Sequence, residues 1–173
     1  MSRLLTDRLQ FLTRNRILWA TFLTTLALTV MFGVVMQIWQ FEIIDEMYVA
    51  DQILAHIDAM TPEQREVHAW LTATIDVAYP LAYGGFFIGV ALKAFPRAGL
   101  LLALPSMLVI PTDLIEGFAQ VMLLSGDASY IDIKVAATPI KLMLFVVGLV
   151  ITLAGLVSLY LERRKAAAPG DIA

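Results

Sequence analysis

The sequence predicts an all-α integral membrane protein, built as a four-helix up-down bundle with an amphipathic helical loop on its outer side. Composition is the first reason: 60% of the 173 residues are hydrophobic, whereas soluble domains are about 45–50% apolar. The second reason is that the excess falls into four long runs instead of being spread evenly. The third is that lysine and arginine cluster at one end of these runs, as they do on one side of a membrane.

The apolar runs cover residues 17–39, 70–92, 98–124 and 135–161. Each is near or above the roughly 20 residues that an α-helix needs to cross about 30 Å of hydrocarbon. The first run is longer than the roughly 7–15 apolar residues of a secretion signal, so we interpret it as a permanent span. The turns at 93–97 and 125–134 are short, which makes neighbouring spans antiparallel.

The basic residues predict a multi-pass protein of the cell (inner) membrane with both termini in the cytoplasm. Segment 1–16, turn 93–97 and tail 162–173 hold nearly all of the lysine and arginine. The other side carries only Arg65 and Lys134. In segment 1–16, leucines recur at helical spacing, which predicts a short helix on the inner membrane surface. The tail is expected to be disordered after Lys165.

The loop at 40–69 is acidic and patterned. Apolar residues alternate with acids between Phe41 and Met60, which predicts an amphipathic helix on the outer surface. Thr61 and Gln64 match a capping box, and Pro62 suits the first helical position. The helix of the second span is therefore expected to begin well outside the membrane.

Four ionisable residues lie inside the apolar runs: Asp76, Asp113, Glu116 and Lys141. A charge at mid-membrane costs about 2.5–3.5 kcal/mol on insertion scales, so such residues face the bundle, find partners or line water. Counted along each helix at 1.5 Å per residue, all four fall at a similar height in the outer third of the bilayer. Three different spans carry them there.

Aromatic hydroxyls and prolines gather at the same height. Tyr79 and Tyr83 lie on roughly the same side of the second span as Asp76. Pro80, Pro111 and Pro139 each lie near a charged residue, and proline leaves a backbone carbonyl without its helical donor. We therefore predict a polar pocket open to the outer face, with these ligand-binding residues: Asp76, Tyr79, Tyr83, Asp113, Glu116 and Lys141.

Charge balance separates a functional from a structural interpretation. An Asp–Lys pair can simply lock helices together, and Gly85 and Gly89 are spaced for close helix contact, within the chain or in a dimer. However, three carboxylates face one lysine in this prediction. Either another cation enters the site or one carboxylic acid stays protonated. This imbalance favours a function modestly.

Other chemistries have little support. The chain has no cysteine, and His56, His68 and the loop acids match no zinc spacing, so we predict neither metal nor cofactor. No Gly-x-Ser-x-Gly elbow or glycine-rich phosphate loop occurs. There is no basic patch with interleaved aromatic residues, so no nucleic-acid partner is expected.

The order of features resembles that of a group of uncharacterised bacterial four-helix integral membrane proteins. The residues that carry the resemblance are Asp76, Tyr79 and Pro80 in the second span, Pro111, Asp113 and Glu116 in the third, and Lys141 in the fourth. It implies no particular activity. The architecture is also faintly similar to that of the emopamil-binding and sigma-2 receptor group, four-helix bundles with membrane-embedded acids around a pocket for sterol-like amines. That likeness implies fold alone.

The sequence leaves three functional hypotheses open. The predicted pocket favours a binding or transporter-like protein for a lipid or small amphiphile in the outer third of the bilayer. An accessory or scaffold subunit is the first alternative, with residues 41–60 docking a membrane protein partner. The second is a membrane-embedded acid–base enzyme of isomerase or hydrolase type, which needs a pair of carboxyl groups facing a void.

Overall fold

The structure, a computed structural model, describes residues 9–167, which are mostly helical with no strand among them. The elements are η1 (Gln10–Thr13), α2 (Asn15–Trp39), α3 (Ala50–Ala59), α4 (Pro62–Ala94), α5 (Gly99–Leu124), η2 (Ala128–Tyr130) and α6 (Ile131–Ala167). Most of the predicted surface helix in segment 1–16, and the end of the tail, lie outside the described residues.

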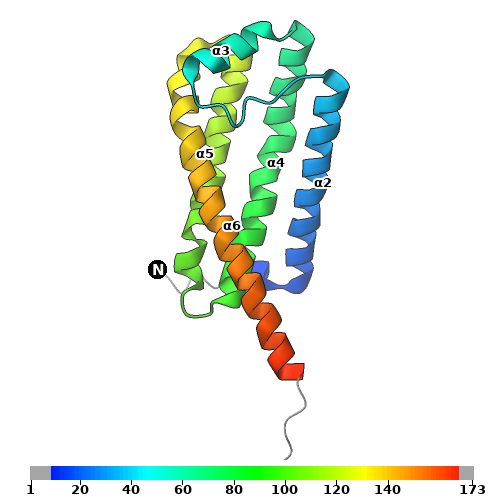
Figure 1. Ribbon diagram of the computed structural model, residues 1–173, viewed down its shortest axis with the longest axis vertical. Helices are drawn as coiled ribbons and strands as arrows, with labels where there is room; N and C mark the ends of the chain where they lie inside the picture. Colours follow the sequence, from blue (N-terminus) through cyan, green and yellow to red (C-terminus); the bar gives the residue numbers. More distant parts are fainter. Residues whose placement is uncertain (1–8, 168–173) are drawn as a thin grey trace, which may run out of the picture.

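Within the described residues, four helices are long and apolar enough to cross a membrane by length and composition: α2, α4, α5 and α6. They run alternately up and down (Figure 1). The all-helical prediction is therefore confirmed. We call the end that carries α3 the outer end of the bundle, and the end with the α4–α5 turn the inner end.

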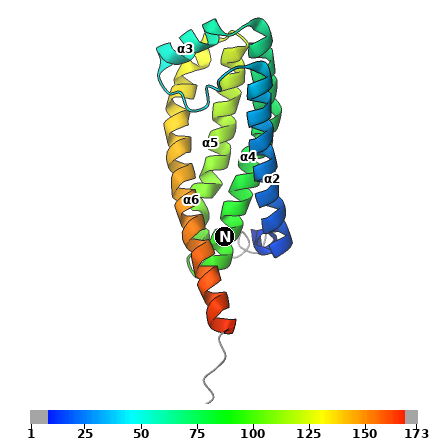
Figure 2. The same ribbon diagram turned by 45° about the vertical axis from the view of Figure 1, so that its right-hand side comes forward.

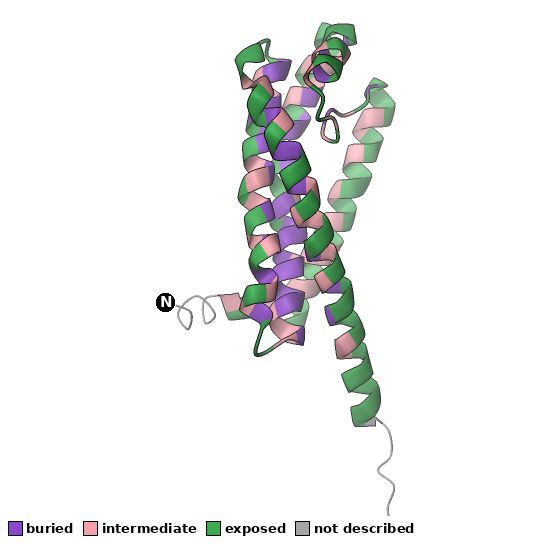
Figure 3. Ribbon diagram, turned by 60° about the vertical axis from the view of Figure 1, so that its left-hand side comes forward, coloured by how far each residue is buried: buried purple, intermediate pink, exposed green. Residues whose placement is uncertain are grey.

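Helix α4 is the centre of the bundle. It packs against α2, α5 and α6, while α5 also packs against α6. In Figure 2, α2 and α6 lie toward opposite edges, with α4 and α5 between them. Helix α2 contacts mainly α4 and η1 and has no buried residue, in contrast to the buried inner faces of the other helices (Figure 3). The bundle is consequently open between α2 and α6.

Small residues set the approach of α2 to α4. A Cβ atom added at Gly89 would lie 2.5 Å from the carbonyl oxygen of Leu12 and 2.7 Å from Cδ2 of Leu18. One added at Gly85 would lie 3.6 Å from Cγ2 of Thr21. The predicted close contact is therefore confirmed at Gly89 and lies within the chain, whereas a Cβ atom at Gly85 would make only an ordinary van der Waals contact.

The outer loop differs from the prediction in its first half. The expected helix from Phe41 to Met60 is wrong for residues 41–49, which follow a left-handed Gln40 (φ 50°) and are irregular. This segment runs down onto the bundle, where Ile44 is fully buried. Only α3 is helical, and it turns Ile53 and Ile57 inward. The apolar stripe therefore packs against the bundle, and docking of a partner by residues 41–60 stays a prediction.

The start of α4 is as predicted. Gln64 N–H donates to Oγ1 of Thr61 at 3.2 Å, and Thr61 N–H donates to Oε1 of Gln64 at 3.0 Å, which completes the capping box. The Gln64 amide also donates to the carbonyls of Trp39 and Gln40. These bonds tie the end of α2 to the start of α4, eight residues before the apolar run begins.

Candidate functional site

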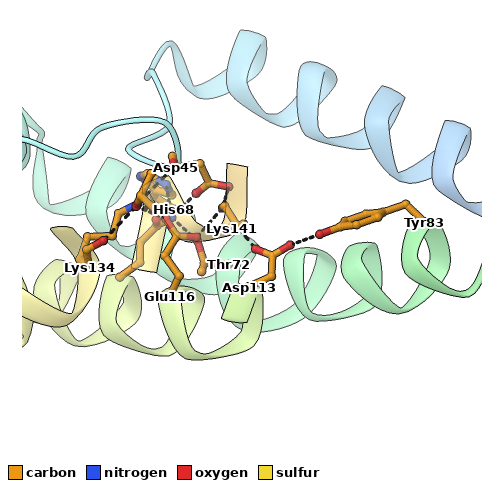
Figure 4. Close-up of polar contacts among 10 residues, drawn as sticks. Asp45, His68, Thr72, Tyr83, Asp113, Glu116, Lys134 and Lys141 are labelled. Atoms are coloured by element: carbon orange, nitrogen blue, oxygen red, sulfur yellow. Dashed lines mark hydrogen bonds and ion pairs between the residues drawn. The ribbon is translucent and has the colours of Figure 1, made fainter. Parts of the chain in front are cut away.

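Charged and polar side chains from the outer loop, α4, α5 and α6 meet beneath the loop (Figure 4). The group consists of Asp45 from the loop, His68, Thr72, Asp76, Tyr79 and Tyr83 from α4, Asp113, Glu116 and Gln120 from α5, and Lys134, Thr138 and Lys141 from α6. The predicted residues do converge from three helices, but they divide into a sealed part and an open part.

Glu116 is the centre of the sealed part. Its side chain is fully buried, and both Lys134 and Lys141 form ion pairs with it. The hydroxyl of Thr138 donates to Oε1 of Glu116 at 2.8 Å. Lys134 also donates to the carbonyl of Asp45 at 3.2 Å. Each oxygen of Glu116 is thus engaged by protein, and this residue joins α5 to α6.

Lys134 corrects the sequence analysis, which placed it in the outer turn at 125–134 and not in the cluster. It is fully buried. Because α6 begins at Ile131, Lys134 is already inside the helix, where it shares a face with Thr138 and Lys141. The helical spacing of residues 134, 138 and 141 could have predicted that Lys134 belongs to the cluster.

Lys141 and Asp113 connect the sealed part to the open part. Besides Glu116, Nζ of Lys141 lies 3.2 Å from Oδ1 of Asp113 and 3.8 Å from Oδ2 of Asp45. The hydroxyl of Tyr83 donates to the other oxygen of Asp113 at 2.7 Å. The positive charge of Lys141 therefore already faces three carboxylates.

Asp76 is in a different situation. The residue is 6% exposed, yet no described side chain forms a hydrogen bond or ion pair with its carboxylate. Gly117 on α5 faces it, and a Cβ atom there would make an ordinary van der Waals contact with Oδ2 of Asp76, at 3.5 Å. Pro80, four residues later, also lacks the amide that would bond the Asp76 carbonyl. Asp76 is consequently the acid of the cluster whose oxygens have no protein donor among the described residues and open onto a cavity.

A second polar group fastens the loop. The Gln120 amide nitrogen lies 2.7 Å from Oδ1 of Asp45, 2.9 Å from Oγ1 of Thr72 and 3.1 Å from Nε2 of His68. The ring of His68 stacks on Phe41, with centroids 4.9 Å apart. The loop is thereby held to α4 and α5 by one amide and one aromatic contact.

The charge of Asp45 is stabilised in this arrangement. Burial by itself would raise the pKa of Asp45, but Lys141, Lys134 and the Gln120 hydrogen bond together hold its pKa below the usual 3.8. The sequence analysis missed Asp45, His68, Thr72 and Gln120. His68 and Thr72 precede Asp76 at four-residue spacing, as Gln120 follows Glu116, so helical periodicity carried a signal for them. Nothing distinguished Asp45 from the other loop acids.

The open part lines a cavity of about 360 Å³ between α2 and α6. Five of the six predicted residues contribute to it, whereas Glu116 lies behind them and does not. Its lining comprises Thr29, Phe32, Ile43, Asp45, Glu46, Asp76, Tyr79, Tyr83, Asp113, Lys141, Leu142 and Phe145. A second hollow of about 240 Å³ between α4 and α5 also reaches Asp76 and Asp113. The charged residues therefore line a void instead of only filling one.

Acids exceed bases in the cluster. Asp45, Asp76, Asp113 and Glu116 supply four carboxylates, whereas Lys134 and Lys141 supply two ammonium groups. The excess of acids predicted from the sequence persists, although the prediction counted one carboxylate and one lysine too few. Lys134 pairs with Glu116, and Lys141 is shared among Glu116, Asp113 and Asp45. Asp76 is therefore the acid of the cluster that lines the cavity without a basic partner among the described residues.

The same geometry limits acid–base chemistry. Glu116 cannot act as the partner of Asp113 on a substrate, because two lysines and Thr138 occupy its oxygens. Asp45, Glu46, Asp76 and Asp113 line the outer cavity, and of these acids Asp76 and Asp113 also line the hollow between α4 and α5.

The chain matches no protein-family model, no curated protein and no solved structure, so geometry alone carries the functional argument.

Proposed function

We propose that the chain is a multi-pass membrane protein that crosses the bilayer through α2, α4, α5 and α6, with both termini in the cytoplasm. The four apolar helices support this topology, as does the clustering of basic residues at the inner end. Large apolar side chains cover the outside of the bundle, with Val30, Ile38 and Leu101 each at least 65% exposed. Such a surface suits lipid and would associate in water.

The outer cavity then binds a small amphiphile with a cationic head group, drawn from the outer part of the bilayer. The observation that carries this proposal is the buried carboxylate of Asp76, which lines the cavity without a partner among the described residues. A buried carboxylate is stable when a cation or donor satisfies it. Lys141 does not fill that role, because its contacts are with Asp45, Asp113 and Glu116.

The remaining walls suit the rest of such a ligand. Tyr79, Tyr83 and Phe145 form a connected aromatic wall, with centroids 5.3 Å and 5.1 Å apart, and aromatic faces attract ammonium groups. Phe32 and Leu142 add apolar surface for a tail. Because α2 packs mainly on α4, the side of the cavity between α2 and α6 is open, and the ligand reaches the cavity sideways from lipid.

The test compares a long-chain primary alkylamine with the alcohol of the same chain length, using protein in lipid nanodiscs. We expect the amine to bind the wild-type protein more tightly than the alcohol does. Asp76→Asn removes the charge and keeps the shape, so amine affinity should fall about tenfold or more, the size of a hydrogen bond to a charged group. Alcohol binding should not change.

Asp58→Asn is the matched control, because Asp58 is an acid on α3 whose side chain is 83% exposed. Equal binding of amine and alcohol by the wild-type protein would contradict the proposal. So would equal losses in Asp76→Asn and Asp58→Asn.

A further inference from the structure

A second cavity, of about 290 Å³, lies at the inner end of the bundle between α2, α4 and α6. Leu18 and Phe22 line it from α2, Phe86 and Val90 from α4, and Leu156 and Leu159 from α6. It occupies the same open side as the outer cavity. On α4 the two are separated by less than a turn, since Tyr83 lines one and Phe86 the other.

The charge of this cavity is opposite to that of the outer one. Its ionisable lining residues are Lys93, Tyr160 and Arg163, with no acid among them. The ammonium of Lys93 donates to the carbonyl of Thr13 at 3.2 Å and to Oδ1 of Asn15. Both acceptors are neutral, so they orient the ammonium group without cancelling its charge.

Two further features strengthen the positive potential. Asn15, which lines the cavity, is the first residue of α2, and no side chain caps that helix. The positive end of the helix dipole therefore lies beside Lys93. The guanidinium of Arg164 lies 5.7 Å from the ring centre of Tyr160, at the rim.

We propose that this inner cavity binds an anionic phospholipid, with its phosphate between Lys93 and Arg163 and an acyl chain along the apolar wall. Charge complementarity selects this occupant, because basic pockets between spanning helices on the cytoplasmic side favour acidic head groups. Trp19 and Tyr160 are 63% and 58% exposed at the rim, and such aromatic residues pack at the head-group level. The inference uses the membrane topology proposed above and does not require the outer site.

The experiment measures lipid binding to the purified, detergent-solubilised full chain by native mass spectrometry. The probes are phosphatidylglycerol and phosphatidylcholine with identical acyl chains. Phosphatidylglycerol should bind the wild-type protein more tightly. Arg163→Gln should weaken phosphatidylglycerol binding about fivefold, the effect of one basic residue near an acidic lipid surface, and should leave phosphatidylcholine unchanged.

Two matched variants make the result specific. Arg97→Gln removes the same charge at the same end of the molecule, outside this cavity, and should change the affinity less than twofold. Leu159→Trp fills the apolar wall and should weaken both lipids. Arg163 and Arg97 are exposed, so thermal unfolding of these variants without lipid should match the wild type.

Equal binding of the two lipids by the wild-type protein, or equal losses in Arg97→Gln and Arg163→Gln, would overturn this inference. Asp76→Asn should keep the full preference for phosphatidylglycerol. This variant distinguishes a failure of the lipid proposal at the inner cavity from a failure of the amine proposal at the outer cavity. A chain that stays monomeric in water without detergent would instead refute the membrane topology on which both proposals rest.

Discussion

The most direct test of the cluster is Glu116→Gln, which removes one charge and keeps the side chain's size. Glu116 and Lys134 are both fully buried. The amide cannot neutralise either lysine. Lys141 retains its ion pairs with the carboxylates of Asp113 and Asp45. Lys134 retains only hydrogen bonds to neutral oxygens, the backbone carbonyl of Asp45 and the hydroxyl of Thr138. Breaking a buried pair from one side typically costs about 3–5 kcal/mol, and we expect a loss of unfolding free energy in that range.

The chain contains its own reference for this magnitude. Asp58 pairs with Arg65 at 3.7 Å, but the Asp58 side chain is 83% exposed. An exposed pair contributes about 0–1 kcal/mol because water and salt screen it. Asp58→Asn is therefore the same chemical change without burial, and it should lower the unfolding free energy by no more than about 1 kcal/mol.

The assay is reversible denaturant unfolding in mixed micelles, repeated with Lys134→Met and with the double variant. Lys134→Met leaves Glu116 paired with Lys141, so the double variant should recover about 0.5–3 kcal/mol relative to the sum of the single losses. A Glu116→Gln loss below about 1 kcal/mol would place the contact among ordinary interhelical hydrogen bonds. That outcome, or strict additivity, would refute the assignment of Glu116 as the charge that holds α5 to α6.

Two further predictions concern α2 and the loop. In the same unfolding assay, Gly89→Ala should destabilise the protein by about 1–3 kcal/mol, because the new methyl group meets the Leu12 carbonyl. Gly33→Ala is the control, because a Cβ atom at Gly33 would have nothing within 4 Å. It should be neutral or should stabilise the protein by up to about 1 kcal/mol. The pKa of Asp45 is lowered on folding, so its contribution is present above pH 3.8 and is lost as the pH falls further. We compare the rate of amide hydrogen exchange in residues 41–49 between the wild type and Asp45→Asn. The two rates should become equal in that acid range. Equal rates at neutral pH as well would contradict the role of Asp45.

The sequence was sufficient for the features that depend on local pattern. Long apolar runs predicted α2, α4, α5 and α6 within a few residues at most ends, because helix formation across such runs is set by length and hydropathy. The cap at Thr61 followed from three adjacent residues. The convergence of Asp76, Asp113 and Lys141 followed from counting residues along each span.

Features that depend on tertiary contact could not be predicted in the same way. Asp45 joins the cluster only because the loop leaves helical geometry after Gln40 and descends to Gln120. The sequence also did not predict that α2 would pack mainly on α4, apart from α5 and α6. Hydropathy reports that a helix prefers an apolar surrounding, and a lipid tail satisfies that preference as well as a neighbouring helix does.

The separation of α2 from α6 explains how one bundle presents two cavities of opposite charge. Helix α2 walls the outer cavity with Thr29 and Phe32 and the inner one with Leu18 and Phe22. If α2 packed on α6 as closely as α5 does, its side chains would fill both spaces. Its position is set instead by contact with α4 along its length, at Gly89 near the inner end, through Tyr79 in the middle and through Gln64 at the outer end. Because these contacts are spread along the helix, a bulky residue at Gly89 should disturb the base-lined inner cavity first and leave the acid-lined cavity around Asp76 intact.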